Sequence, residues 1–137
     1  MKKVLVLCTG NSCRSIMGEA LINKFLDGVI AKSAGSNPTG KVNPNATKVL
    51  KEIDAWDDRY YSKKIDEVIN EDFDLVVTVC DNAKESCPVF PKPIKKIHVS
   101  FEDPDGKDIE EFRKTRDLIK EKLLKVLKKN YLIKEKL

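Results

Sequence analysis

The feature that most constrains the fold of this chain is a short apolar run that leads directly into a polar turn with two cysteines. The run spans residues 4–7, and the turn, residues 8–15, reads C-T-G-N-S-C-R-S. Apolar residues at helical spacing begin near Met17, so the pattern predicts a buried strand, a tight turn and a helix start in that order. Cys8 and Arg14 stand in C-x5-R spacing, which places both of them at this one turn.

This arrangement predicts an anion pocket with Cys8 at its floor. The backbone N–H groups of such a turn and the N-terminus of the following helix attract negative charge. The guanidinium of Arg14 can direct two donors onto a tetrahedral oxyanion. The same field favours the thiolate of Cys8, which is the nucleophilic form of a cysteine. The residues expected to surround the oxyanion are Thr9, Gly10, Asn11, Ser12, Cys13, Arg14 and Ser15.

The composition is that of a single globular domain, residues 1–137, with 41% hydrophobic and 35% charged residues. No apolar run approaches the length of about 18 residues that a membrane helix needs. The basic pair and the short apolar run at the N-terminus lack the length and the cleavage site of a signal peptide. We therefore expect a cytoplasmic protein that does not enter a membrane.

Nucleic acid is not an expected partner. The formal net charge is +4, and the lysines are spread along the chain. A nucleic-acid surface needs clustered basic residues with aromatic residues among them, whereas only 7% of the residues here are aromatic.

Four cysteines form two pairs along the chain, Cys8 with Cys13 and Cys80 with Cys87. In a cytoplasmic protein they are expected to be catalytic, redox-active or metal-binding, and not a structural disulfide framework. The C-x4-C and C-x6-C spacings are loose for zinc, so we predict no bound metal. Cys13 is expected to be a packing residue, and inert burial is the alternative for the second pair. His98, the only histidine, is expected to be structural.

Strands and helices alternate along the sequence. Strands are predicted at residues 3–8, 29–34, 73–79 and 94–99, and helices at 14–27, 45–53, 66–70 and from 108 onward. This alternation predicts an α/β fold, a three-layer sandwich in which a four-stranded parallel sheet is covered on both faces. Ligands of such sheets bind beyond the carboxyl ends of the strands. Cys8 and Cys80 each follow a strand, so both should reach the same crevice. The last residues are expected to fray.

The motif C-T-G-N-S-C-R-S, placed after a buried strand, resembles the phosphate-binding loop of two groups of proteins with a common fold. These are the low-molecular-weight tyrosine phosphatases and the thioredoxin-coupled arsenate reductases. Both groups carry an Asp-Pro pair before the last helix, and Asp103-Pro104 stands in that place here. The resemblance covers nearly the whole chain and implies that Asp103 is the general acid, with Asp105 as its rival.

Three features resemble the reductases more than the phosphatases. Cys80 and Cys87 have the spacing of the two additional redox cysteines of the reductases. The stretch that holds them, V-V-T-V-C-D-N-A-K-E-S-C-P, also resembles the reductase pattern. Asp103-Pro104 is followed by D-G-K, where the phosphatases commonly have tyrosines. We therefore interpret the chain as similar to a thioredoxin-coupled arsenate reductase.

This resemblance implies a reaction and its partners. Cys8 attacks arsenate, for which phosphate and sulfate are mimics, and a Cys8–Cys80 disulfide is followed by a Cys80–Cys87 disulfide. Thioredoxin reduces the last disulfide, no cofactor is bound, and a monomer is expected. The segment 81–87 should be helical when reduced and partly unravelled when oxidised. Two alternatives stay open: a low-molecular-weight tyrosine phosphatase with a phosphocysteine intermediate at Cys8, and a thiol-switch binding module without turnover.

The resemblance also implies supporting roles. Asn11 would fix the shape of the loop, because asparagine tolerates the left-handed conformation. Ser15 would hydrogen-bond the Cys8 thiolate. Some members of the family bind potassium through a glutamate, a serine and an aspartate. Glu19 and Ser33 match the first two, and Lys63 stands in the place of the aspartate. The lysine ammonium would replace the cation, so we predict no potassium requirement.

Overall fold

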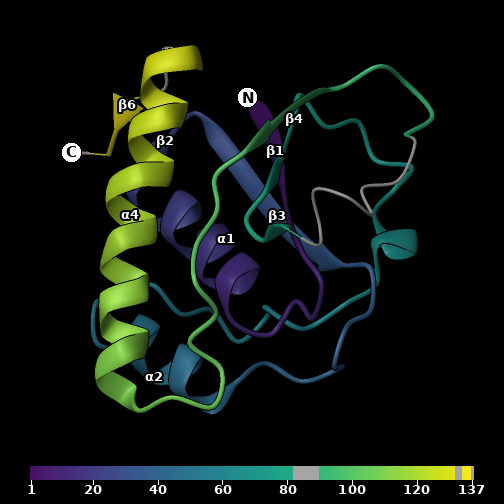
Figure 1. Ribbon diagram of the computed structural model, residues 1–137. Helices are drawn as coiled ribbons and strands as arrows, with labels where there is room; N and C mark the ends of the chain where they lie inside the picture. The colour runs from purple at the N-terminus through teal and green to yellow at the C-terminus, as the bar shows by residue number, and fades with distance from the viewer. Residues whose placement is uncertain (82–89, 132–133, 137) are drawn as a thin grey trace.

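The structure is a computed structural model that describes residues 1–81, 90–131 and 134–136. All four predicted strands of the main sheet are present, together with the helices expected to flank them (Figure 1). The elements in chain order are β1 (Lys2–Cys8), α1 (Arg14–Phe25), β2 (Leu26–Asp27), β3 (Val29–Gly35), α2 (Pro44–Lys51), the 3-10 helix η1 (Ile65–Glu67), β4 (Leu75–Thr78), β5 (Lys95–His98), α4 (Ile109–Tyr131) and β6 (Lys134–Glu135).

Four of the strands form one parallel sheet in the order β3-β1-β4-β5. Strand β1 is central: Val6 lies opposite Ser33 of β3 on one side and opposite Val77 of β4 on the other. Residues 4–8 are all buried, which explains why this strand lacks polar alternation. The predicted four-stranded parallel sheet is confirmed.

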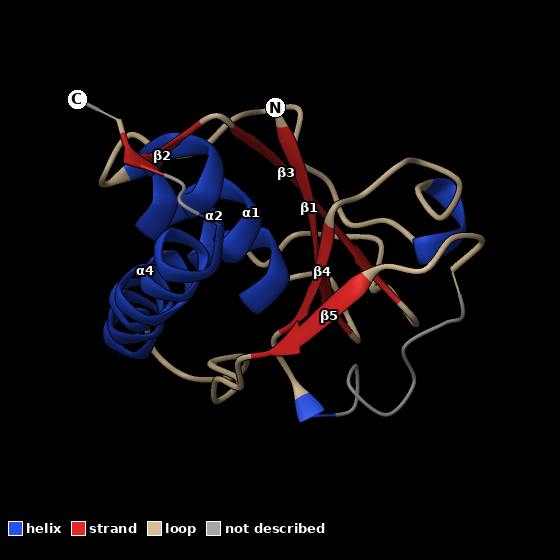
Figure 2. Ribbon diagram, turned by 90° about the horizontal axis from the view of Figure 1, so that it is seen from above, coloured by secondary structure: helices blue, strands red, loops and turns tan. Residues whose placement is uncertain are grey.

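Helices α1, α2 and α4 pack together on one face of the sheet, and η1 lies on the opposite side (Figure 2). Helix α1 lies between the sheet and α4, and its residues 15–22 are all buried. Gly18 permits this close packing, because a Cβ there would meet Val6 at 3.1 Å and Leu123 at 3.3 Å. The N-terminus of α1, where the polar turn ends, is therefore held firmly. Within the described residues, no helix has the length and apolar character needed to cross a bilayer.

The two ends of the helical layer differ from the prediction. Helix α1 ends at Phe25 and not at residue 27, because Leu26 and Asp27 form β2 and pair with β6 in a two-stranded antiparallel sheet. The N–H of Lys136 donates to the carbonyl of Phe25 at 2.8 Å. The described end of the tail, which was expected to fray, is thus attached to the end of α1.

Side-chain caps set the start of two helices. Oδ1 of Asp108 accepts the N–H of Glu111 at 3.1 Å, which is the first bond of a capping box at the start of α4. Oδ1 of Asn43 accepts the N–H of Asn45 at 2.9 Å and caps α2. The helix expected at 66–70 is the shorter 3-10 helix η1.

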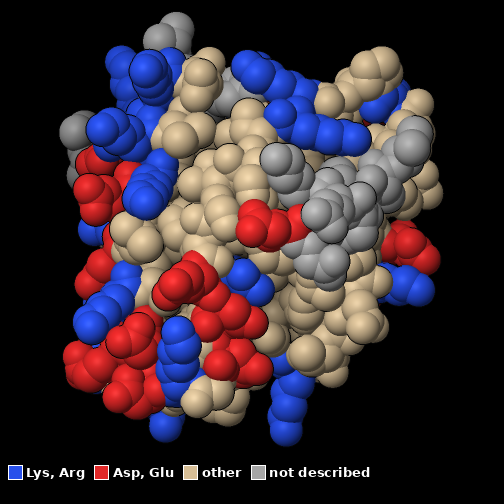
Figure 3. Space-filling view, in the orientation of Figure 1, with Lys and Arg blue, Asp and Glu red and all other residues tan. Residues whose placement is uncertain are grey.

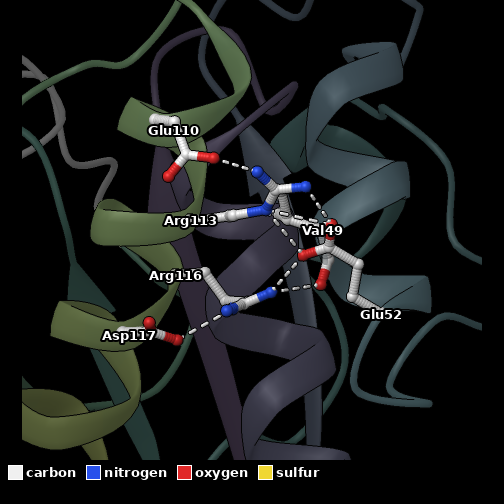
Figure 4. A network of polar contacts seen from close by, with 6 residues as sticks. All are labelled: Val49, Glu52, Glu110, Arg113, Arg116 and Asp117. Carbon is white, nitrogen blue, oxygen red and sulfur yellow. Dashed lines mark hydrogen bonds and ion pairs between the residues drawn. The ribbon is translucent and has the colours of Figure 1, made fainter.

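A network of charged side chains fastens the C-terminal end of α2 to α4 (Figure 4). Nη1 of Arg116 donates to the carbonyl of Val49 at 2.9 Å and to Oε1 of Glu52 at 2.8 Å. Arg113 donates to both carboxylate oxygens of Glu52. Arg116 is 8% exposed, and its Nε donates to Asp117 at 2.8 Å. This network fixes α2, whose opposite end begins beside the polar turn.

Candidate active site

The polar turn, called the oxyanion loop below (residues 8–15), connects β1 to α1 at the carboxyl edge of the sheet (Figure 1). The chain passes from β1 to β3 on one side and later to β4 on the other, so this edge is the switch point at which α/β sheets bind ligands. Gly35 ends β3 against the loop, because a Cβ there would meet the carbonyl of Thr9 at 2.4 Å. Only glycine therefore lets the loop pack so close to β3.

Asn11 sets the shape of the oxyanion loop. Its φ is 46°, the left-handed conformation that was predicted for this residue. Its Oδ1 accepts the N–H of Lys63 at 2.9 Å, so its Nδ2 is the group that donates to Oγ of Ser15 at 2.7 Å and to Oγ of Ser33 at 3.0 Å. Asn11 is fully buried, so water does not compete for these bonds. The bond expected from Ser15 to Cys8 stays a prediction.

Both terminal nitrogens of the Arg14 guanidinium contact the loop before α4. Nη1 donates to the carbonyl of Phe101 at 2.9 Å, and Nη2 lies 3.4 Å from Oδ2 of Asp103. Its Nε is buried and, in the part of the chain that the structure describes, has no hydrogen-bond partner. A buried donor without an acceptor costs free energy, which an oxyanion in the loop would recover. The geometry of Arg14 therefore fits an anion site.

Cys8 is buried at the end of β1, beside Cys80, which is buried beyond β4 with its Sγ 3.6 Å from Oγ1 of Thr9. The two cysteines thus lie beyond the carboxyl ends of neighbouring strands, as the strand order predicts. The hydrogen bond to Cys80 and burial raise the pKa of Cys8, against the lowering effect of the Arg14 charge and the Thr9 backbone. The expected preference for the thiolate is thus opposed, because two adjacent sulfurs do not both ionise readily. If Cys8 and Cys80 share one proton, one of the two is still a thiolate and can act as the nucleophile.

The loop before α4 brings Asp103 to the rim of the site. Its side chain is 51% exposed and lies against Arg14, so it is accessible to both solvent and a bound anion. Asp105, the rival acid, instead accepts a hydrogen bond from Nδ2 of Asn43 at 2.9 Å. On the face of the molecule shown in Figure 3, acidic side chains gather over the lower part. The exposed acids of the loop are Glu102, Asp103, Asp105 and Asp108.

Cys13 lies in the oxyanion loop, but it is a thiol at neutral pH. Burial raises its pKa to about 11, and the charges of Asp103 and Asp105 add to the rise, while a hydrogen bond with Ser12 opposes it. The side chain is 4% exposed and belongs to the hydrophobic core. This environment agrees with the packing role expected for Cys13.

Glu19 and Ser33 meet beneath Asn11. Oγ of Ser33 donates to Oε1 of Glu19 at 2.6 Å, and burial raises the pKa of Glu19 to about 7. The ammonium of Lys63 donates to the carbonyl of Tyr61 at 3.1 Å and lies 4.4 Å from the centre of its ring. Lys63 therefore opposes the rise in the pKa of Glu19 through its charge alone. Among the residues described, no three metal-binding side chains converge. The absence of a potassium requirement stays a prediction.

Two further expectations concern the region after β4. Cys87 and residues 82–87 of the expected redox helix lie outside the described residues. His98 has both ring nitrogens engaged: Nδ1 lies 2.7 Å from Oγ1 of Thr78, and Nε2 lies 2.9 Å from Oδ1 of Asp81. This agrees with the structural role expected for His98.

Three contacts at the site escaped the sequence analysis. Oγ1 of Thr9 lies 3.6 Å from Sγ of Cys80, and the carbonyl of Phe101 accepts a hydrogen bond from Arg14. Asn43 joins the oxyanion loop to the loop before α4. A backbone carbonyl carries no sequence signal. An asparagine before a proline does signal a helix cap, but its second partner is 62 residues away.

Comparisons with known proteins agree with this fold and site. Residues 3–136 match the family model of the low molecular weight phosphotyrosine protein phosphatases. An arsenate reductase of Staphylococcus aureus (strain N315) is 43% identical over 120 residues, which cover 87% of this chain and 91% of that protein. The crystal structure of an arsenate reductase from Archaeoglobus fulgidus has a TM-score of 0.78 at 34% identity, covering 90% of this chain and 98% of that one.

A low molecular weight protein tyrosine phosphatase from T. tengcongensis has a TM-score of 0.79 at 26% identity, covering 94% of this chain and 99% of that one. Reductases and phosphatases thus share the fold of this protein. The family model spans nearly the whole chain, and the site has the cysteine, the arginine and the loop between strand and helix described above. The chain therefore belongs to the low molecular weight phosphotyrosine protein phosphatase family.

Proposed function

We propose that this protein is a cytoplasmic arsenate reductase that reduces arsenate to arsenite through a relay of cysteine thiols, with thioredoxin as the reductant. The observation that carries the proposal is the second thiol, that of Cys80, buried beside Cys8 and the oxyanion loop, with its Sγ 3.6 Å from Oγ1 of Thr9. A phosphatase needs one cysteine and a water, whereas a reductase needs a second thiol that attacks the first. The 43% identity to an arsenate reductase supports the same assignment.

In the first step the oxyanion loop holds arsenate, a tetrahedral anion with the shape and charge of phosphate. The Nε of Arg14, which has no acceptor in residues 1–81 and 90–131, provides a donor, and the N-terminus of α1 provides positive potential. The thiolate of Cys8 attacks arsenic, an As–S bond forms and one As–O bond breaks. Asp103, which contacts Arg14 at the rim, gives a proton to the leaving oxygen, which departs as water.

In the second step the electrons move. Sγ of Cys80 attacks Sγ of Cys8, an S–S bond forms, and the S–As bond breaks with its electron pair on arsenic. Arsenic goes from As(V) to As(III) and leaves as arsenite, while the two sulfurs are oxidised to a disulfide. The hydroxyl of Thr9, 3.6 Å from the sulfur of Cys80, is placed to donate to a thiolate there.

In the third step Cys87 attacks Cys80, which releases the Cys8 thiolate and leaves a Cys80–Cys87 disulfide. Reduced thioredoxin takes up this disulfide by thiol–disulfide exchange and restores the starting state. Every group in this sequence is a side chain of one chain or the external dithiol, so we propose a monomer that binds no cofactor and no metal.

The alternative is a tyrosine phosphatase, in which water hydrolyses a phosphocysteine at Cys8. The likeness to a solved tyrosine phosphatase of the family favours this alternative. Asp103-Pro104 is followed by D-G-K, however, which offers no aromatic side chain to hold a phosphotyrosine ring. Together with the thiol of Cys80 beside Cys8, this favours the reductase.

The test is arsenate reduction coupled to thioredoxin, thioredoxin reductase and NADPH, followed as NADPH oxidation. Wild type is expected to turn over continuously. Cys80→Ser should form the Cys8–arsenic adduct and release no arsenite. Cys87→Ser should release a single arsenite per chain and stop as a Cys8–Cys80 disulfide, which mass spectrometry detects.

Thermal unfolding with and without phosphate provides the control. Neither serine variant removes a donor of the oxyanion loop, so both should keep the increase in Tm that phosphate gives to wild type. Wild type that hydrolyses aryl phosphates but oxidises no NADPH with arsenate would overturn the reductase in favour of the phosphatase.

A further inference from the structure

Asn43 lies where three segments of the chain meet: the oxyanion loop, the start of α2 and the loop before α4. Its N–H donates to the carbonyl of Ser12 at 3.0 Å. Its Oδ1 accepts the N–H of Asn45 at 2.9 Å, as the cap of α2. Its Nδ2 donates to Oδ1 of Asp105 at 2.9 Å. One side chain thus serves a helix end and an acidic loop at the same time.

The cap decides which end of the Asn43 amide faces Asp105. A backbone N–H only donates, so the atom that faces Asn45 is the carbonyl oxygen of the amide. The amino group is therefore the atom that faces Asp105, and its bond to the carboxylate is charge-assisted. A carboxylate at position 43 would keep the cap, lose this donor and repel Asp105.

Asp105 continues the connection to Asp103. The N–H of Asp105 donates to Oδ1 of Asp103 at 3.0 Å, and Oδ2 of Asp103 lies 3.4 Å from Nη2 of Arg14. Because Ser12 and Arg14 belong to the same loop, the contacts form a closed ring: Ser12, Asn43, Asp105, Asp103 and Arg14. A single ion pair at a half-exposed carboxylate restrains it only weakly. The hydrogen bond from Asn43 to Asp105 supplies a second restraint on Asp103.

We propose that Asn43 is a positioning residue, which orients Asp103 toward the oxyanion loop by holding Asp105. Asn43 acts through Asp105, and the bound anion is held by other groups. This inference rests on the proposed function only in the role given to Asp103. Proton transfer requires hydrogen-bond distance between the acid and the leaving oxygen. Release of the Asp103 loop therefore slows the first chemical step and leaves anion binding at Arg14 nearly unchanged.

Asn43→Asp is the sharpest variant, because it keeps the cap of α2 and places two carboxylates against each other. In single turnover with arsenate we expect formation of the Cys8–arsenic adduct to slow by about tenfold, the usual scale for losing a hydrogen bond to a charged group. Inhibition by phosphate and the Tm should stay close to wild type. Asn45→Asp, the matched control, makes the same chemical change two residues later and should leave the rate unchanged.

Two combinations separate positioning from a merely structural role. In Asn43→Asp with Asp105→Asn, the amide introduced at position 105 donates to the carboxylate introduced at position 43. Most of the lost rate should return. In an Asp103→Asn background, Asn43→Asp should cause no further loss. Rate losses that add in that background would overturn the inference, because Asn43 would then act independently of Asp103.

A measurement without turnover separates this inference from the proposed function. The N–H of Asp105 donates to Oδ1 of Asp103, so this bond should slow the hydrogen exchange of the Asp105 amide. Asn43→Asp should abolish this protection, and Asn45→Asp should retain it. Protection that survives in Asn43→Asp overturns the positioning role. Loss of the protection, in a protein whose wild type reduces no arsenate, supports the positioning role and overturns only the proposed function.

Discussion

Arg116 and Arg14 are both largely shielded from solvent, but their donors are used differently. Arg116 on α4 is 8% exposed and donates to the carbonyl of Val49, to Glu52 and to Asp117 (Figure 4). The side chain of Arg14 is 15% exposed, against 10% for the side chain of Arg116, yet Nε of Arg14 has no partner within the described residues. Arg116 has its partners within the protein and joins two helices, whereas Arg14 keeps one buried donor that the proposed oxyanion would engage.

The two arginines differ in the number of buried donors that lack an acceptor within the described residues. Arg14 has one such donor and Arg116 has none, which predicts that Arg14 is the one that binds a ligand. Buried polar groups in folded proteins are nearly always hydrogen-bonded, so an exception calls for an explanation. At Arg14 the explanation we propose is an anion in the oxyanion loop, since Arg14 begins α1 and a helix N-terminus also favours negative charge.

The largest expected effect comes from removing the unsatisfied donor. Arg14→Lys keeps a positive charge but loses Nε and the planar fork. We expect arsenate reduction to fall by roughly 100-fold or more in kcat/KM. Phosphate at 100 times its Kd should stabilise wild type by about 2.7 kcal/mol, and this gain should be lost in the variant. Thermal unfolding with and without phosphate measures this gain in stability. A variant that keeps the gain would show that Nε is not a ligand donor.

A smaller effect concerns Glu19, a buried charge on the same helix as Arg14. Burial raises its pKa from 4.5 to about 7. Below pH 4.5 the carboxyl is neutral in both states, and between pH 4.5 and 7 it ionises only in the unfolded chain. Stability should therefore fall across this window, by up to roughly 3 kcal/mol, and Glu19 should add no further change above it.

Glu19→Gln tests this dependence, because its amide oxygen still accepts the hydrogen bond from Ser33 and cannot ionise. The variant should match wild type near pH 4.5 and exceed its free energy of unfolding at pH 8. Denaturant unfolding at the two pH values provides the comparison. An identical loss of stability in both proteins would show that another group titrates in this window.

The smallest expected effect lies on the structural side of the comparison. Arg116→Met keeps an apolar stem and removes the bonds to Val49 and Glu52, so we expect a loss of roughly 1–3 kcal/mol in stability. Phosphate should still raise the Tm, because the partners of Arg116 lie on α4 and at the end of α2. If the variant lost the phosphate effect, the two arginines would not be separable. Glu52→Gln keeps one of the two acceptor oxygens and leaves the bond from Arg116 to Val49 in place, so it should cost less stability.

The oxyanion loop could be predicted because its chemistry is local. Cys8 and Arg14 are six residues apart, and an apolar run before them and a helical pattern after them fix strand, turn and helix. The left-handed φ of Asn11 follows from the same short stretch. The pairing of β2 with β6 could not be predicted, because two-residue strands have no periodicity to detect.

The relation between Cys8 and Cys80 was predictable in part. Both follow buried parallel strands, and the carboxyl ends of such strands open into one crevice. The raised pKa of Cys8 was not predictable, because it depends on the contact between the two sulfurs and on their burial. Position along a strand is a property of the sequence, whereas contact between side chains is a property of the packed molecule.

The sequence by itself determined that a cysteine and an arginine share one loop between a strand and a helix, with a second cysteine after a neighbouring strand, and from this it predicted an anion site with a nucleophilic cysteine. These features follow from residue type, spacing and the order of strands and helices. Only the tertiary structure decided that Nε of Arg14 has no acceptor among the described residues and that Asn43 reaches Asp105. The partners that orient these side chains lie 62 and 87 residues away, so the chain must fold before they meet.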